Sequence, residues 1–297
     1  MNEKTSVILT ALGGPESLDE VGPFMAAFMK KPPSPPVLAA VQERYALIGG
    51  KSPLVEIVKD QSKALEREFG PGHKVFPGFM YSNPSIAESC KTALSDGAEK
   101  IIAISLSPYE TAVTTGIYKK AFEAIDLPAG CLTFIPSFHN NPFFIQAWQD
   151  LLGATLIGTN AGSTAVIFTS HSIPTRYIES GDPYRAQIEE TVTVLADRLG
   201  LLNWFIAWQS KGARATEPWL EPDVESIIYK IAESGARSIV EVPIGFTGDH
   251  LETLYDIDIV HKNFAEKWGL SFMRVPSLNA NPLFIRALAD IVHKAPL

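Results

Sequence analysis

The chain has 297 residues, of which 46% are hydrophobic and 20% charged, and its formal net charge is −8. This is the composition of a globular protein with one large or two medium cores, and the negative charge argues against non-specific binding to nucleic acid. No run approaches the roughly 18 apolar residues of a transmembrane helix, and the chain starts with the pattern of a strand rather than of a signal peptide. Two cysteines, Cys90 and Cys131, are too few for a disulfide framework or a Cys-ligated iron–sulfur cluster, so we expect a reduced, cytoplasmic protein.

The first half of the chain begins with a strand, VILTAL at 7–12, which ends at a glycine turn. Apolar residues at helical spacing follow, as in Ile86, Cys90 and Ala93, and then comes a second β-branched strand, KIIAISL at 100–106. A helix, a strand and a terminal helix led by an Asn-Pro pair complete the unit. This alternation of strands and helices is typical of a parallel sheet covered on both faces.

The second half repeats this order, with strands AVIFTSH at 165–171 and SIVEVPI at 238–244. Three pairs of segments align, with shifts of 138, 140 and 159 residues: 83–102 with 221–240, 136–152 with 276–292, and 7–15 with 166–174. Such an extended match indicates a tandem duplication. The last pair makes Leu12 and His171 equivalent, so only the second half has an imidazole at this strand end.

The pattern predicts an α/β fold of two similar doubly wound (Rossmann-like) lobes with parallel sheets, related by internal duplication, with a cleft between them. We expect an N-terminal lobe of residues 1–113 joined by a returning C-terminal helix, 275–297. Residues 114–274 would form a C-terminal lobe that carries a metal and proton site. Ligands of such folds bind at the carboxyl ends of strands, which selects four loops: 10–15, 107–116, 169–174 and 245–254.

His171, in TSHSIP, is a candidate base or metal ligand at a strand end. The alternative is a loop histidine that only bonds to nearby backbone. Glu252 also has a structural alternative, because Asp249 and Glu252 fit a D-x-x-E capping box. Capping does not require Asp256, which shares a helix face with Glu252 and repels it. Two carboxylates and a histidine beside a cleft suit a divalent cation such as Fe²⁺.

Two further features of the sequence are less specific. His250 and His261 are expected in supporting or surface positions. The segment PFMAAFMKKPPSPP, 23–36, is either core or an exposed apolar lip around a ligand, with Lys30 and Lys31 at its edge. No Gly-rich nucleotide motif, HExxH or GxSxG is present, so nucleotide-binding, zinc-peptidase and serine-hydrolase functions lack their signatures.

Together these segments resemble the ferrochelatase family, lyases that insert Fe²⁺ into a porphyrin. The resemblance covers nearly the whole chain and is carried by the following motifs, in the order and spacing of the family: LGGP (12–15), RYALIGGKSPL (44–54), FTSHSIP (168–174), GDPY (181–184), WQSKGARATEPWLEPDV (208–224) and GFTGDHLETLYDID (245–258). It implies a two-lobed fold, porphyrin and Fe²⁺ as substrates, and a role in heme biosynthesis.

The resemblance also implies site residues. The catalytic pair falls on His171 and Glu252, and Asp256 joins them at the metal site. The porphyrin contacts fall on five residues: Lys30, Arg44, Tyr45, Ser52 and Tyr118. No cofactor is expected to be bound permanently, and the sequence lacks the iron–sulfur-binding tail of animal members. We also expect a raised pKa for Glu252 in an apolar cleft.

Two alternatives stay open at this point. One is a chelatase for another tetrapyrrole or metal, such as cobalt into a corrin precursor. The other is a non-catalytic porphyrin carrier, which would not need His171 or Glu252. Whether protoporphyrin IX or coproporphyrin III is preferred also stays open, as does the order in which His171 and Glu252 meet the metal. No membrane-spanning segment is expected, although the 23–36 lip could make a peripheral membrane contact.

Overall fold

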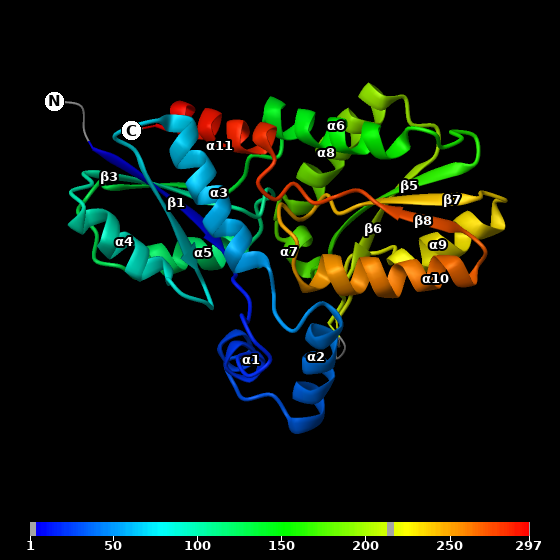
Figure 1. Ribbon diagram of the computed structural model, residues 1–297, viewed down its shortest axis with the longest axis horizontal. Helices are drawn as coiled ribbons and strands as arrows, with labels where there is room; N and C mark the ends of the chain where they lie inside the picture. The colour runs from blue at the N-terminus through cyan, green and yellow to red at the C-terminus, as the bar shows by residue number, and fades with distance from the viewer. Residues whose placement is uncertain (1–3, 213–216, 297) are drawn as a thin grey trace.

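A computed structural model describes residues 4–212 and 217–296 and shows two four-stranded parallel sheets side by side (Figure 1). The first sheet has the order β2-β1-β3-β4 and the second the order β6-β5-β7-β8. The strands are β1 Thr5–Ala11, β2 Lys74–Phe79, β3 Lys100–Ser105, β4 Leu132–Ile135, β5 Thr164–His171, β6 Trp204–Gln209, β7 Ser238–Val242 and β8 Ser271–Arg274. The prediction of two parallel α/β lobes is therefore confirmed.

Helices surround both sheets. They are α1 Val21–Met29, α2 Pro35–Leu47, α3 Leu54–Phe69, α4 Ile86–Ser95, α5 Thr115–Glu123, α6 Pro142–Leu156, α7 Thr175–Glu179, α8 Tyr184–Leu199, α9 Val224–Glu233, α10 Lys262–Lys267 and α11 Pro282–Lys294. A further helix, η1 Glu252–His261, has the π-type hydrogen-bond pattern. Figure 1 shows α3, α6 and α11 along one face of the molecule and α1 with α2 projecting from the opposite face.

The two sheets repeat each other in register as well as in order. Val7 of β1 pairs with Ile102 of β3, and Val166 of β5 pairs with Val240 of β7. These are the pairs that the duplication predicts, so Leu12 and His171 occupy equivalent positions at the carboxyl ends of β1 and β5. The equivalent helices α6 and α11 also start alike, because an Asn side chain caps the first turn and a proline takes the first helical position.

The expected division at residue 113 does not coincide with the boundary between the sheets. Strand β4 pairs with β3, so the N-terminal lobe continues at least to Ile135. Hydrogen bonding along a sheet edge, which the sequence does not show directly, makes this assignment. Helix α6 then packs on α8 and β7 of the C-terminal lobe, while α11 packs on α3 and α6.

One hydrophobic core runs through both lobes on the α3–α6–α11 side. It includes Val7 and Val166 from the two central strands, together with Trp148 of α6 and Phe284 of α11. Smaller cores lie on the opposite faces of the sheets, one in each lobe. Each lobe is thus covered on both faces, but the lobes share their largest core. Among the described residues, no helix combines the length and apolar character needed to cross a bilayer.

Candidate active site

His171 is the last residue of β5, and its side chain is 37% exposed. Its Nδ1 lies 2.5 Å from the carbonyl oxygen of Ser172, the backbone contact that the structural alternative expected. Its Nε2 lies 3.4 Å from Oε1 of Glu252. Because Nδ1–H donates to the backbone, Nε2 is the nitrogen left to exchange a proton or bind a metal.

Glu252, at the start of η1, lies between two histidines. Its Oε2 is 3.5 Å from Nε2 of His250, on the side opposite the contact with His171. The backbone carbonyl of Glu252 also accepts a hydrogen bond of 3.2 Å from the side-chain Nε2 of Gln209 at the end of β6. The ends of β5 and β6 thus hold the first turn of η1 in place, with the carboxylate facing His171.

The charges in this pair support each other. Burial opposes a charged imidazole, but the Glu252 carboxylate and its hydrogen bond raise the pKa of His171 to about 9. Burial also opposes the carboxylate, but His171 and His250 together lower the pKa of Glu252 well below its ordinary value. The expectation of a raised pKa for Glu252 is therefore wrong, because two neighbouring imidazoles outweigh the apolar surroundings.

Asp256 lies further along η1 in a different environment. Its Oδ2 accepts a hydrogen bond of 2.8 Å from Oγ of Ser210, which follows β6. Burial and the nearby Glu252 charge raise the pKa of Asp256, against the opposing effect of the Ser210 hydrogen bond. Environments that separate the pKa values of two neighbouring carboxyl groups are typical of sites that move protons.

Ser210 itself has an unusual backbone conformation, with a φ of 59°. A residue other than glycine rarely takes this left-handed conformation, which costs roughly 1–2 kcal/mol. At functional sites such strain is often retained because it directs a side chain. Here it accompanies the hydrogen bond to Asp256.

The capping box expected at the start of η1 does not form. The residue before the helix is Leu251, which makes no side-chain cap, and Asp249 accepts a hydrogen bond of 3.2 Å from the side chain of Thr253. Its carboxylate accepts hydrogen bonds from Arg274 and Ser277 through Oδ1 and from Asn279 through Oδ2. Because Asp249 is bound to the start of the last segment of the chain, Glu252 is not used as a cap and its carboxylate is available to the histidines.

The π-helix is anchored to the C-terminal sheet at two further points. Arg274 at the end of β8 forms a forked contact with Asp258, at 2.7 Å and 3.1 Å. His261 and Glu241 of β7 form a buried pair, with Nδ1 of His261 2.9 Å and 3.2 Å from the two carboxylate oxygens. A π-helix of ten residues is rare, and shorter π segments occur frequently at functional sites.

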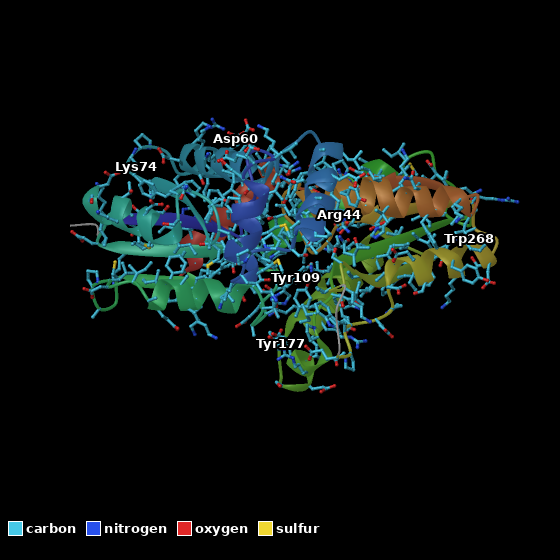
Figure 2. The ribbon with its side chains drawn as sticks, turned by 90° about the horizontal axis from the view of Figure 1, so that it is seen from below. Arg44, Asp60, Lys74, Tyr109, Tyr177 and Trp268 are labelled. Carbon is cyan, nitrogen blue, oxygen red and sulfur yellow. The ribbon has the colours of Figure 1, made fainter. Side chains whose placement is uncertain are left out.

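Helix α2 of the N-terminal lobe approaches η1, and two predicted porphyrin residues lie there. The guanidinium of Arg44 is 5.3 Å from the ring centre of Tyr255, a cation–π contact across the lobes. Tyr45 is buried, and burial together with the Glu252 charge raises the pKa of its hydroxyl. Figure 2 shows Arg44 where the two lobes meet.

The other predicted porphyrin residues lie apart from this group. Lys30 follows α1 and is exposed, with a φ of 55°. Ser52 is buried beside Gly14, and its hydroxyl accepts from the amide of Leu54 at 3.3 Å. Tyr118 is 2% exposed and packs in the outer core of the N-terminal lobe. The structure thus brings Arg44 and Tyr45 to the His171–Glu252 pair, and it places Ser52 and Tyr118 inside the protein.

Three contributors to the site were not singled out from the sequence. They are Gln209 and Ser210, which follow each other at the end of β6, and Tyr184, whose hydroxyl bonds to the carbonyl of His171 at 3.0 Å. Gln209 and Ser210 belong to the WQSKGARATEPWLEPDV motif, of which residues 213–216 lie outside the described residues. The signal available was the motif itself, since its first residues end a strand beside the one that carries His171.

Among residues 4–212 and 217–296, no group of three or more His, Cys, Asp or Glu side chains has an arrangement that could hold a metal ion. Cavities of about 630 Å³ and 620 Å³ lie among the described residues, and neither of these two is lined by a predicted site residue. The candidate site is therefore the partly exposed surface around His171, Glu252 and Asp256 that faces α2.

Comparison with known proteins gives a consistent result. The family model for ferrochelatase matches residues 4–295. The chain is 34% identical over 316 residues to a ferrochelatase of Geotalea uraniireducens (strain Rf4), covering 99% of this chain and 98% of that protein. It is 34% identical to the ferrochelatase of Deinococcus radiodurans over 300 residues, covering 97% and 95%. It is 31% identical to a coproporphyrin III ferrochelatase of Oceanobacillus iheyensis over 303 residues, covering 98% and 97%.

Among solved structures, SirB from Bacillus subtilis with Fe³⁺ superposes with a TM-score of 0.61 at 12% identity, covering 98% of this chain and 95% of that one. At this identity the likeness shows the fold. The sequence similarity over the full length shows the family. The chain belongs to the ferrochelatase family, the metal-chelating lyases that insert Fe²⁺ into a porphyrin in heme biosynthesis.

Proposed function

We propose that His171 and Glu252 perform the proton and metal transfers by which this ferrochelatase inserts Fe²⁺ into its porphyrin. The observation that carries the proposal is the 3.4 Å contact between Nε2 of His171 and Oε1 of Glu252 at a partly exposed strand end. A nitrogen base and a carboxylate held together in this way can accept a proton and stabilise the resulting imidazolium. Both also ligate Fe²⁺ once the imidazole is neutral.

The reaction releases two pyrrole protons for each metal ion inserted. In this proposal the neutral form of His171 takes up a pyrrole proton through Nε2, and the ionised Glu252 stabilises the charge that forms. Asp256, whose pKa is raised by burial and by the Glu252 charge, passes protons on toward solvent. The support for this division is the contrast between the two carboxyl groups, since only Glu252 lies between two histidines.

Fe²⁺ takes part as substrate in this proposal, and no cofactor is bound permanently. Glu252, Asp256 and His171 would meet the ion before insertion. The absence of an iron–sulfur cluster is part of the same proposal, because the chain holds only Cys90 and Cys131 and such clusters take four cysteine ligands. Both thiols are buried in the N-terminal lobe.

The porphyrin would lie between α2 and η1, with its propionates near cationic side chains. Arg44 is exposed beside Tyr255, and Lys30 is exposed at the end of α1. Tyr45 lies close enough to Glu252 for the carboxylate to act on its hydroxyl. Ser52 and Tyr118 retain their predicted porphyrin contacts in this proposal only if their side chains become exposed, because both are buried.

The test is to measure porphyrin binding and Fe²⁺ insertion separately in Glu252→Gln and His171→Ala. We expect porphyrin affinity to change little and insertion to fall at least about 100-fold, because each variant removes a group that meets the reacting atoms. The matched control is a His–Glu pair outside the site, His139 and Glu190 at 3.1 Å. His139→Ala and Glu190→Gln should insert iron at the wild-type rate, whereas wild-type rates for the first two variants would refute the assignment.

The porphyrin substrate is tested by competing protoporphyrin IX against coproporphyrin III. One relative is a coproporphyrin III ferrochelatase, and four propionates need more cationic partners than two. If coproporphyrin is the substrate, Lys30→Ala and Lys31→Ala should each lower its kcat/KM more than that of protoporphyrin. Equal effects on the two porphyrins would show that these lysines do not determine which porphyrin the enzyme prefers.

We also propose a cytoplasmic enzyme that contacts membranes through the 23–36 lip. Phe28 is 56% exposed and Met29 is 36% exposed, and Lys30 and Lys31 follow them directly. Apolar side chains beside cations are the combination that binds an anionic bilayer surface. Co-sedimentation with anionic vesicles should fall in Phe28→Ser, while Leu202→Ser, with a side chain 81% exposed on the C-terminal lobe, should leave it unchanged.

A further inference from the structure

The turn before α8 joins the two lobes close to His171. The carboxylate of Asp182 accepts two hydrogen bonds from the N-terminal lobe through Oδ2, one from Oγ1 of Thr111 at 2.9 Å and one from the amide of Ala112 at 2.7 Å. Its Oδ1 accepts from the amide of Tyr184 at 3.0 Å. One carboxylate therefore ties the loop at 107–116 to the first residue of α8.

Tyr184 continues this connection into the site. Its hydroxyl donates to the carbonyl oxygen of His171 at 3.0 Å and lies 2.5 Å from Oγ of Ser170. A phenol has one proton, so the hydroxyl that donates to His171 accepts from Ser170. Ser170 and His171 are the last two residues of β5. Their hydrogen bonds to the Tyr184 hydroxyl fix the position of the backbone that carries the His171 ring.

The ring of Tyr184 is also held from both lobes. It meets Tyr109 of the N-terminal lobe edge to face, with centres 6.2 Å apart, and it lies 5.8 Å from Trp208 of β6. Tyr109 and Tyr184 are buried. Figure 2 shows Tyr109 at the junction of the lobes. Tyr184 thus has little freedom to move unless the lobes move.

We infer that Asp182 and Tyr184 are positioning residues that hold His171 toward Glu252 and couple this geometry to the seating of the two lobes. The inference rests on the proposed role of His171. Nδ1 of His171 is bonded to the carbonyl oxygen of Ser172, one residue after the carbonyl that Tyr184 contacts. The imidazole ring therefore moves with this stretch of backbone. The 3.4 Å contact with Glu252 is then sensitive to a small shift of that peptide.

The first test is Tyr184→Phe, which keeps the packed ring and removes the hydroxyl. We expect kcat for iron insertion to fall about tenfold, in the range found when the partner that orients a reacting group is lost. The dissociation constant for porphyrin should stay within about twofold of wild type, because Tyr184 is buried and does not reach the porphyrin. Tyr229→Phe is the matched control, since its hydroxyl donates to Glu233 on the exposed face of α9.

The second test asks whether Asp182 acts through Tyr184. Asp182→Asn alone should lower kcat, and combining it with Tyr184→Phe should lower kcat by much less than the product of the two single effects. Independent residues would give the full product, which would remove Asp182 from the proposal.

The outcomes separate this inference from the proposed function. If His171→Ala is inactive and Tyr184→Phe has wild-type kcat, the inference fails and the function stands. A Tyr184→Phe enzyme that loses porphyrin binding and thermal stability together would also refute it, because the hydroxyl would then be only structural. If His171→Ala is as active as wild type, the proposed role of His171 is wrong, and the inference that rests on it is wrong as well.

Discussion

At the scale of residues, two His–Glu pairs of the C-terminal lobe have different surroundings. His171 and Glu252 are partly exposed at a strand end, whereas His261 and Glu241 are buried at 3% and 0% exposure. A buried ion pair is out of reach of a substrate. Removing one of its partners is costly, because the other charge is then buried without compensation. The exposed pair is therefore the candidate for chemistry, and the buried pair holds η1 on the sheet.

The buried pair predicts a pH-dependent contribution to stability. Burial alone would lower the pKa of His261, but the Glu241 carboxylate raises it above its ordinary value. Stability from this group is complete below the unfolded pKa of about 6.5 and is lost as pH rises through the higher folded pKa. Urea unfolding of His261→Gln should therefore show a deficit in the free energy of unfolding that is larger at pH 6 than at pH 9.

A deficit in His261→Gln that is equal at both pH values would show that Glu241 does not raise the pKa of His261 in the folded protein.

Ser210 gives a second prediction at this scale. Ser210→Gly and Ser210→Ala both remove the hydroxyl that binds Asp256, but only glycine relieves the backbone at a φ of 59°. We expect both variants to lose the same amount of insertion activity, and Ser210→Gly to be the more stable by about 1 kcal/mol. Urea unfolding and insertion kinetics on the two variants measure this. If the activity of the variants follows their stability, the hydroxyl has no part in the site.

At the scale of elements, η1 is held at its start, middle and end by groups from other segments. Asp249 binds Asn279 before the helix, Asp258 binds Arg274 within it, and His261 binds Glu241 at its end. Such anchoring matters because a π-helix is less favourable than an α-helix of the same length. Tertiary contacts therefore stabilise a register that local propensity would not select.

Arg274 is the anchor that can be tested most directly. Its side chain is 14% exposed and binds both Asp249 and Asp258. Arg274→Met should destabilise the protein by about 2–4 kcal/mol, because two carboxylates lose their partner. It should also lower insertion activity, because η1 carries Glu252 and Asp256. Arg274→Lys keeps the charge but not the fork, so we expect an intermediate stability, measured by urea unfolding. Full stability in Arg274→Met would show that the remaining anchors suffice.

At the scale of the whole molecule, the duplication produced two lobes that share their largest core. Phe284 and Trp148 pack into one core with the central strands of both sheets. Helix α6 leaves the first lobe for the second, and α11 returns to α3 of the first. The shared core fixes the position of the two lobes relative to each other. Hydrogen bonds between the lobes do the same, such as that from Thr247 to the carbonyl of Leu106 at 2.8 Å.

We therefore expect the two lobes to unfold as one cooperative unit. Phe284→Ala should lower the free energy of unfolding by about 3–5 kcal/mol, the cost of truncating a buried phenylalanine. Far-ultraviolet circular dichroism and tryptophan fluorescence should still report a single transition. Phe122→Ala, in the outer core of the N-terminal lobe alone, provides the comparison. Two separate transitions in that variant would show that the lobes unfold independently.

The sequence by itself determined the fold class, the duplication and the family. Strand and helix periodicity depends only on local alternation, and paired segments such as 136–152 and 276–292 are visible without coordinates. It also selected His171, Glu252 and Asp256, because titratable residues after strands are recognisable from their position.

Tertiary structure decided the rest, because each remaining feature depends on contacts between distant segments. The lobe boundary follows from the pairing of β4 with β3. The low pKa of Glu252 follows from two histidines that meet it in space. The π-type hydrogen bonding of η1 and the hydrogen bond from Tyr184 to His171 depend on partners that are distant in the sequence. Ser277, for example, is 28 residues from Asp249. Sequence patterns show which groups are present, and only the packed chain shows which of them neutralise, anchor or aim each other.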